Sequence, residues 1–143
     1  MAELFTEEWV ESWGRELRRS EEYREAAQEW EGAIVFELRA SQELDEDRAV
    51  FLDLLHGDCR HARLAADGDR EGARYVVSAD LATWRTVLDG TISVLPAIMR
   101  GKLRLRKGKL STLMPFTAAA RELLAAATRI ETELPRSPED LDC

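Results

Sequence analysis

The sequence predicts an α+β fold in which helices cover one face of a largely antiparallel five-stranded sheet. Three observations support this prediction. Apolar residues recur every three or four positions at both ends of the chain, they alternate with polar residues between those ends, and short runs rich in glycine and aspartate separate the patterned segments. The expected element order is ααββββααβα. Because four strands follow one another with short turns between them, most strand pairs should be antiparallel.

Two helices are expected within residues 3–30. From Leu4 to Arg18 the apolar side chains form one stripe at helical spacing, and glutamates occupy the opposite side. Thr6 and Ser20 each precede a helical run. Their hydroxyl groups can accept a hydrogen bond from a free amide at a helix N-terminus, so each is expected to cap a helix.

The period then changes from that of a helix to that of a strand. Residues 33–40 (AIVFELRA) alternate in the manner of a half-buried strand, and residues 72–79 (GARYVVSA) are rich in β-branched and aromatic side chains. Two further runs, 48–57 and 58–66, flank His56-Gly57-Asp58, which has the composition of a hairpin turn. These segments predict the first four strands.

Helical spacing returns after the fourth strand. Ser78 is placed to cap a helix, and Gly90 is placed to end it. A second short helix follows, with Gly101 as its stop signal. The sheet and its covering helices are therefore expected within residues 33–134.

The last strand and the last helix complete the pattern. Residues 102–106 alternate strictly between basic and apolar side chains, which predicts the fifth strand. From Leu110 to Leu134 the chain is expected to be helical. Pro115 should start a new segment there, because an interior proline interrupts the hydrogen-bond ladder of a helix.

Composition indicates one globular domain. The chain has 143 residues, with 28 acidic and 20 basic side chains and a net charge of −8, and this length can bury a core. A negative net charge disfavours nucleic acid as a partner, because phosphate binding needs a positive surface. No apolar run approaches the roughly 18 residues of a membrane span. We expect a single domain over residues 1–134 and a flexible acidic tail over residues 135–143.

The expected location is the cytoplasm. Residues 1–13 are acidic and amphipathic, unlike a signal or transit peptide. Cys59 and Cys143 are far apart in the sequence, and Cys143 is the last residue. A structural disulfide to a chain end is not expected, which points to a reducing compartment.

The densest group of chemically reactive side chains is the segment His56-Gly57-Asp58-Cys59-Arg60-His61. Zinc needs about four convergent ligands, and no second cluster of cysteine and histidine completes the set. His61 shares the strand face of Cys59 only if no β-bulge intervenes. Ordinary turn and strand residues are therefore favoured over a metal site or a reactive cysteine.

Outside this segment the sequence offers few candidate catalytic residues. Asp53 lies inside an apolar strand, where solvent contact or an ion pair with an arginine is favoured over a catalytic role. The motifs of phosphate-binding loops, serine hydrolases and zinc proteases do not occur. We expect a protein that is not an enzyme and that uses no metal and no cofactor.

Residues 100–109 form a basic run on this acidic chain, and its role has three possible interpretations. The preferred one is the solvated face of an edge strand, where positive charge discourages edge-to-edge pairing. The second is a docking surface for an anionic membrane, and the third, nucleic acid, is disfavoured because no aromatic side chain interleaves the run. The run consists of Arg100, Lys102, Arg104, Arg106, Lys107 and Lys109.

Residues 75–116 carry an ordered block of motifs. An apolar strand is followed by a helix that begins at Asp80 and closes in Leu-Asp-Gly, then by a second helix, then by GKLRLRKG and a final helix. This block resembles the signature region of the sterol carrier protein type-2 family, and the topology extends the resemblance to about residues 30–134. The matching positions are Asp80, Trp84, Leu88, Gly90, Ala97, Met99, Gly101, Lys102, Leu103, Leu105, Gly108 and Leu113. The two N-terminal helices look like those of a bacterial stand-alone branch.

The resemblance implies a non-catalytic lipid carrier with a sterol-carrier-type fold. Members of that family bind fatty acids, acyl-CoA, phospholipids or sterols in an apolar tunnel between sheet and helices. The alternative is an interaction module that receives a partner helix or peptide in the same groove. The residues expected to line the tunnel are Trp84, Leu88, Ile92, Leu95, Ile98, Met99, Leu103, Leu113, Met114, Phe116 and Leu124. Contact with an anionic membrane is expected at Arg100, Lys102, Arg104 and Arg106.

Overall fold

The computed structural model describes residues 2–41 and 44–134, and its elements confirm the predicted order while adding short ones to it. The helices are α1 (Glu7–Arg19), α2 (Glu21–Ala26), α3 (Asp69–Gly72), α4 (Leu81–Leu88), α5 (Val94–Met99), α6 (Leu110–Leu113), the 3₁₀ turn η1 (Met114–Phe116) and α7 (Thr117–Thr128). The strands are β1 (Ala2–Glu3), β2 (Ile34–Leu38), β3 (Arg48–Leu55), β4 (Asp58–Leu64), β5 (Tyr75–Ala79), β6 (Arg104–Lys107) and β7 (Thr132–Glu133). The tail expected at residues 135–143 lies outside the described residues.

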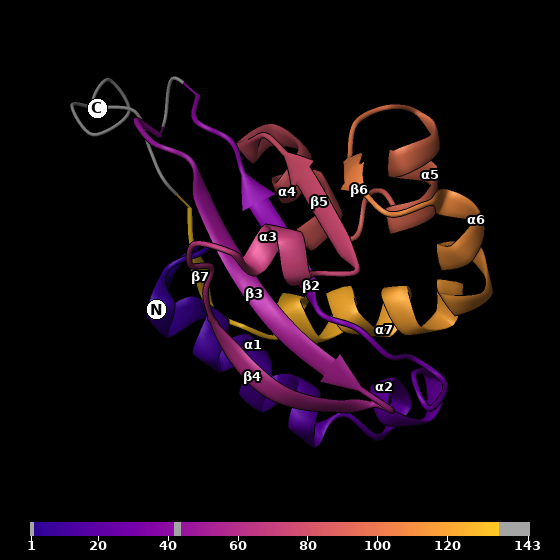
Figure 1. Cartoon of the computed structure of the whole chain (residues 1–143). Coiled ribbons are helices and arrows are strands. Elements are labelled where there is room, and N and C mark those ends of the chain that lie inside the picture. Colours follow the sequence, from indigo (N-terminus) through magenta and orange to yellow (C-terminus); the bar gives the residue numbers. More distant parts are fainter. Residues whose placement is uncertain (1, 42–43, 135–143) are drawn as a thin grey trace.

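Five strands form one mixed sheet in the order β4-β3-β2-β5-β6 (Figure 1). The pairs β2–β3, β3–β4 and β5–β6 are antiparallel, as predicted for most of the sheet. β2 and β5 pair in parallel, with Ile34 opposite Tyr75. The prediction of short turns between all four strands is therefore wrong after β4. The chain crosses the sheet through α3 to reach β5, because a parallel pair needs a crossover connection.

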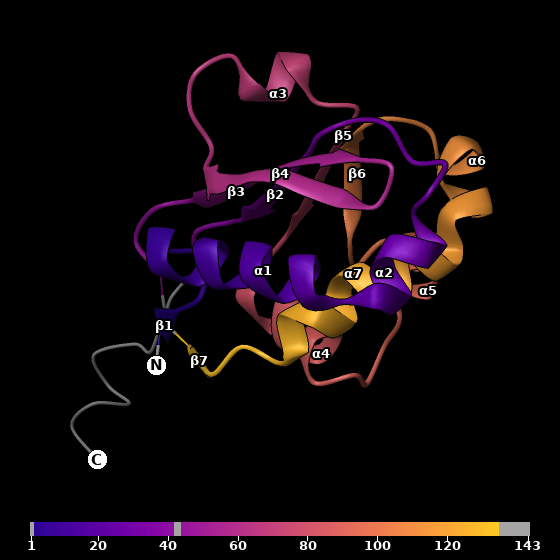
Figure 2. The same ribbon diagram turned by 90° about the horizontal axis from the view of Figure 1, so that it is seen from below.

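The long helices cover one face of the sheet, and α3 lies on the other face (Figure 2). This arrangement follows from the strand pattern, since alternate residues point to opposite faces. In β2 the side chains of Ile34, Phe36 and Leu38 join the main core, whereas Val35 belongs to a small cluster on the far face. Glu37 also lies on the far face, where its carboxylate pairs with Arg70 of the α3 segment at 2.5 Å.

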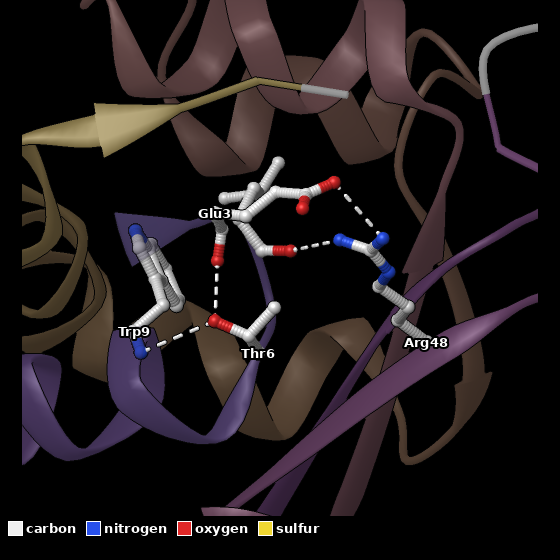
Figure 3. Close-up of polar contacts among 5 residues, drawn as sticks. Glu3, Thr6, Trp9 and Arg48 are labelled. Atoms are coloured by element: carbon white, nitrogen blue, oxygen red, sulfur yellow. Dashed lines mark hydrogen bonds and ion pairs between the residues drawn. The ribbon is translucent and has the colours of Figure 1, made fainter. Parts of the chain in front are cut away.

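The N-terminus of α1 is fixed by its cap and by the sheet (Figure 3). The Thr6 hydroxyl accepts a hydrogen bond from the amide of Trp9 at 3.4 Å and donates one to the Glu3 carbonyl at 2.7 Å. Arg48 of β3 donates to the Leu4 carbonyl at 2.9 Å and pairs with the Glu3 carboxylate at 3.0 Å. The predicted cap at Thr6 is confirmed.

The other predicted caps have different outcomes. The Ser20 hydroxyl accepts from the amide of Tyr23 at 3.0 Å and caps α2, as expected. Ser78 does not cap α4, because β5 extends past it and buries it in the sheet. Asp80 takes this role, accepting from the amide of Thr83 at 2.9 Å. This hydrogen bond holds the pKa of the Asp80 carboxyl below its ordinary value.

The C-terminal helix is shorter than predicted. Pro115 begins a new segment as expected, because it lies in η1 between α6 and α7. α7 ends at Thr128, and the helix expected to continue to Leu134 is replaced by β7, which pairs in parallel with β1. The indole of Trp9 donates to the Thr132 hydroxyl at 2.8 Å and holds β7 against α1. Tertiary pairing with the N-terminus thus overrides the local helical pattern.

The predicted β3–β4 hairpin is confirmed. His56 and Gly57 form its two-residue loop with φ angles of 50° and 85°, the positive pair that a type I′ turn requires. A β-bulge follows, because Asp53 lies opposite His61 and Leu54 lies opposite Cys59, with the register shifting between them. The bulge fixes which side chains of β4 share a face.

Candidate functional site

An apolar cavity of about 30 Å³ lies between the sheet and the helices. Its lining residues lie on α2, α6, η1 and α7, on β2 and β3, and in the loop before β2. Its volume suits one or two water-sized groups, so a long chain fits only if part of the wall moves. The lining residues come from both layers and are Tyr23, Trp30, Ile34, Leu54, Leu113, Phe116, Ala119, Ala120 and Leu123.

Aromatic side chains form one wall of this cavity. Trp30, in the loop before β2, meets Phe116 of η1 edge to face, with ring centres 4.9 Å apart. Trp30 also stacks on Tyr75 of β5, with ring centres 5.4 Å apart. The Tyr75 hydroxyl hydrogen-bonds to the Thr112 hydroxyl of α6. The wall therefore joins the loop before β2, the sheet and the α6–η1 segment.

The one hydroxyl-bearing lining residue is uncharged. Tyr23 of α2 is 1% exposed. Burial raises the pKa of the Tyr23 phenol well above its ordinary value, and the neighbouring Cys59 and Asp58 raise it further. The phenol stays neutral at physiological pH, so the cavity presents an uncharged surface to a ligand.

The eleven residues expected to line a tunnel do not all lie together. Leu113 and Phe116 line the cavity. Ile92 and Leu124 line a different hollow of about 310 Å³, formed by the α4–α5 connection and α7. That hollow is also lined by the charged Arg121 and the polar Ser93 and Thr128, so it is less suited to an apolar chain.

The other expected lining residues contact neither space. Trp84 and Leu103 are buried in the core, where the Trp84 indole donates to the Glu37 carbonyl at 2.8 Å. Met99 and Met114 are exposed at the surface. The remaining members of the set are partly buried against the core and comprise Leu88, Leu95 and Ile98.

Most of the cavity wall was missed by sequence reasoning. Trp30 lies in an irregular segment, and its position depends on the path of the chain. Ile34 and Leu54 look like ordinary strand residues. Ala119 and Leu123 gave a usable signal, because with Phe116 they repeat at spacings of three and four along one helix face.

The segment around Cys59 forms a set of structural contacts. Because of the bulge, Cys59 points into the core while His61 is exposed on β4. His56 lies in the hairpin loop, away from Cys59 and His61. Its Nδ1 is 2.8 Å from the Gln28 carbonyl and its Nε2 is 3.0 Å from the Glu31 carboxylate. Across residues 2–41 and 44–134, no three side chains of the metal-binding types converge.

Asp53 and several residues of the basic run make ion pairs or hydrogen bonds. Asp53 pairs with Arg60 across the hairpin at 3.0 Å, which is the ion pair that the sequence favoured. β6 is an edge strand, so the edge-strand interpretation holds for Arg104, Arg106 and Lys107, whereas the other members of the basic run lie outside the strand. Arg106 approaches Glu37 at 3.9 Å, and the Lys107 ammonium donates to backbone carbonyls of the α3 segment.

Comparison with protein families matches residues 14–121 to the SCP-2 sterol transfer family. The chain belongs to this family. Membership agrees with the resemblance seen in residues 75–116 and indicates binding or transfer of an apolar lipid. A search of curated proteins gave no match.

Solved structures of SCP-2 proteins share this fold. A crystal structure of sterol carrier protein 2 is 42% identical, with a TM-score of 0.81, over 90% of this chain and 99% of the other. A suggested sterol carrier protein from Thermus thermophilus is 40% identical, with a TM-score of 0.82, over 93% of each chain. The apo sterol carrier protein 2 of Yarrowia lipolytica is 18% identical, with a TM-score of 0.56 over 82% of this chain and 90% of the other, and supports the fold alone.

Proposed function

We propose that this SCP-2 family member is a non-catalytic carrier that binds the apolar chain of a lipid in the cavity between the sheet and α6–α7. The observation that carries the proposal is the uncharged lining of that cavity, to which both layers contribute. Burial of an apolar chain there releases about 25 cal/mol for each Å² removed from water. A charged ligand group would instead have to stay at the rim.

The wall that moves to admit a chain is the α6–η1 segment. Ile34 and Leu54 belong to strands held by neighbours on both sides, whereas Leu113 and Phe116 belong to a four-residue helix and a three-residue turn. Short elements with an exposed face open at lower free energy than the central strands of a sheet. Displacement of Phe116 enlarges the cavity without breaking a strand pair.

A cavity-filling substitution tests the proposal. Ala119 lines the cavity and is buried, so Ala119→Leu places a larger side chain in the space that a ligand needs. Overpacking of an occupied cavity costs about 1–3 kcal/mol, so affinity for a fluorescent fatty acid should fall roughly tenfold or more. Leucine is a good helix former, which leaves α7 intact.

The matched control is Ala118→Leu, on the exposed side of the same helix. It should bind the fluorescent fatty acid as tightly as the wild type. Equal affinity of Ala119→Leu and the wild type, with the variant shown to be folded by circular dichroism, contradicts binding in this cavity.

The membrane is the partner from which such a carrier loads, and we propose that the end of the molecule formed by residues 90–121 docks on it. This segment, called the basic end below, holds seven of the 20 basic residues and none of the 28 acidic ones. It comprises α5, β6, α6, η1 and the start of α7. Met99 and Met114 are 75% and 56% exposed there. Positive charge around exposed apolar side chains suits an anionic bilayer surface.

A further inference from the structure

Arg74, the residue before β5, places its guanidinium over the aromatic wall of the cavity. Its Cζ lies 4.8 Å from the ring centre of Trp30, 5.7 Å from that of Tyr75 and 6.0 Å from that of Phe116. Trp30 and Phe116 also line the cavity. The cation therefore lies beside two residues of the cavity wall.

The Arg74 side chain is held in this position. Its Nη1 donates to the Glu31 carbonyl at 2.8 Å, and its backbone amide donates to the Ala33 carbonyl at 2.8 Å. The stem lies against Gly32, which has a φ of 134°, and a Cβ at Gly32 would come within 2.8 Å of the Cβ and Cδ of Arg74. A residue with a side chain at position 32 would displace the arginine, so the loop accommodates the side chain only because a glycine is there.

The charge of Arg74 is not matched by an acidic side chain. The carboxylate of Glu31, whose carbonyl Arg74 contacts, lies instead 3.0 Å from Nε2 of His56. Throughout the described part of the chain, no carboxylate lies within ion-pair distance of Arg74. A guanidinium has five N–H donors in a planar fork. Arg74 is exposed, so donors that the Glu31 carbonyl does not use can reach a ligand.

We propose that Arg74 binds the oxyanion head of a single-chain amphiphile whose apolar chain passes between Trp30 and Phe116 into the cavity. This inference rests on the proposed function and adds to it the residue that binds the head group. A guanidinium pairs with carboxylate or phosphate through two parallel hydrogen bonds. Stacking on the rings fixes the plane of the fork without consuming those donors. The head stays at the surface, where its charge remains solvated, while the chain is buried.

The test compares three ligands with the same sixteen-carbon chain: palmitate, hexadecyl phosphate and uncharged hexadecanol. Affinity is measured by displacement of a fluorescent fatty acid at mildly alkaline pH, where both oxyanions are ionised. For Arg74→Gln we expect the affinity for palmitate, for hexadecyl phosphate or for both to fall about tenfold, because the variant loses hydrogen bonds between a charged donor and a charged acceptor. Hexadecanol should bind as before, which also shows that the variant is folded.

Two controls and three contrary outcomes complete the design. Arg74→Lys keeps the charge but loses the planar fork, so it should recover only part of the oxyanion affinity. Arg85→Gln removes an exposed arginine of α4 and should change nothing. Selective loss for palmitate assigns a carboxylate, and selective loss for hexadecyl phosphate assigns a phosphate. Equal loss for all three ligands, or no loss for any, overturns the role of Arg74. Failure of the wild type to bind any of the three contradicts the proposed function and the inference with it.

Discussion

Single residues decide whether a reactive group on this chain is available for chemistry. Cys59 illustrates this. Its thiol is 2% exposed, and its Sγ lies 3.6 Å from the His61 carbonyl, which it contacts as a weak donor. Burial raises the pKa of Cys59 to about 11. Since the thiolate is the nucleophile, the folded protein holds this cysteine in an unreactive form at physiological pH.

This leads to a prediction at the residue scale. In a Cys143→Ser variant, iodoacetamide should not label Cys59 until the protein is unfolded with denaturant. Because the pKa is raised above the unfolded value near 9.0, the unfolded state ionises first, and the free energy of unfolding should fall as the pH rises from about 9 to 11. Labelling is read by mass spectrometry and stability by urea denaturation. Rapid labelling of the folded variant at neutral pH would show that the thiol is accessible and ionised.

Arg74 shows how a residue acquires a role that its sequence position does not suggest. It follows a turn and precedes a strand, and nothing in its neighbours distinguishes it from the other arginines. Its contacts with Trp30, Tyr75 and Phe116 join three segments of the chain. Only the parallel pairing of β2 with β5 brings the loop before β2 beside the start of β5.

At the scale of elements, the sequence was most informative where a local pattern suffices. The α1 stripe, the caps at Thr6 and Ser20 and the hairpin at His56-Gly57 all depend on neighbouring residues, and all are confirmed. The strand alternation also identified the face of β2 that packs on the helices.

Elements that depend on distant pairing were predicted less well. The parallel β2–β5 pair and the β1–β7 pair join segments far apart in the sequence. The candidate site follows the same division. Leu113 and Phe116 lie on a helical stripe and were expected, whereas Trp30 and Leu54 reach the cavity only through the crossing of the chain. A periodic pattern reports that a side chain is buried, not which cavity it borders.

Charge is distributed unevenly over the molecule. The net charge is −8, yet residues 90–121 contain basic residues and no acidic ones. The elements of this basic end gather on one side of the molecule in Figures 1 and 2. Within the described residues, no helix is both long and apolar enough to cross a bilayer. At physiological salt, repulsion between the acidic part of the protein and an anionic membrane is largely screened beyond roughly 8 Å. Closer to the membrane, the protein is attracted when the basic end faces the surface and repelled when the acidic part does.

A prediction at this scale concerns transfer to vesicles. The triple variant Arg100→Glu, Lys102→Glu and Lys109→Glu should lose the acceleration that phosphatidylserine gives to fatty-acid transfer into phosphatidylcholine vesicles. Each cation near an anionic surface contributes about 1 kcal/mol, so the decrease should reach roughly one to two orders of magnitude. Arg106 is left unchanged because it lies near Glu37.

The matched control reverses three exposed arginines outside the basic end, Arg15, Arg19 and Arg129. It changes the net charge by the same amount and should keep the response to phosphatidylserine. If both triple variants respond to phosphatidylserine alike, the effect belongs to net charge and the docking surface is not the basic end.

The central claim is that an apolar chain occupies the cavity between the sheet and α6–α7. Intermolecular nuclear Overhauser effects from ¹³C-labelled palmitate to protein methyl groups test this most directly. We expect contacts from the chain to Ile34, Leu54 and Leu123, which line the cavity. Contacts confined to Ile92, Val94 and Leu124, which line the separate hollow between the α4–α5 connection and α7, would contradict it.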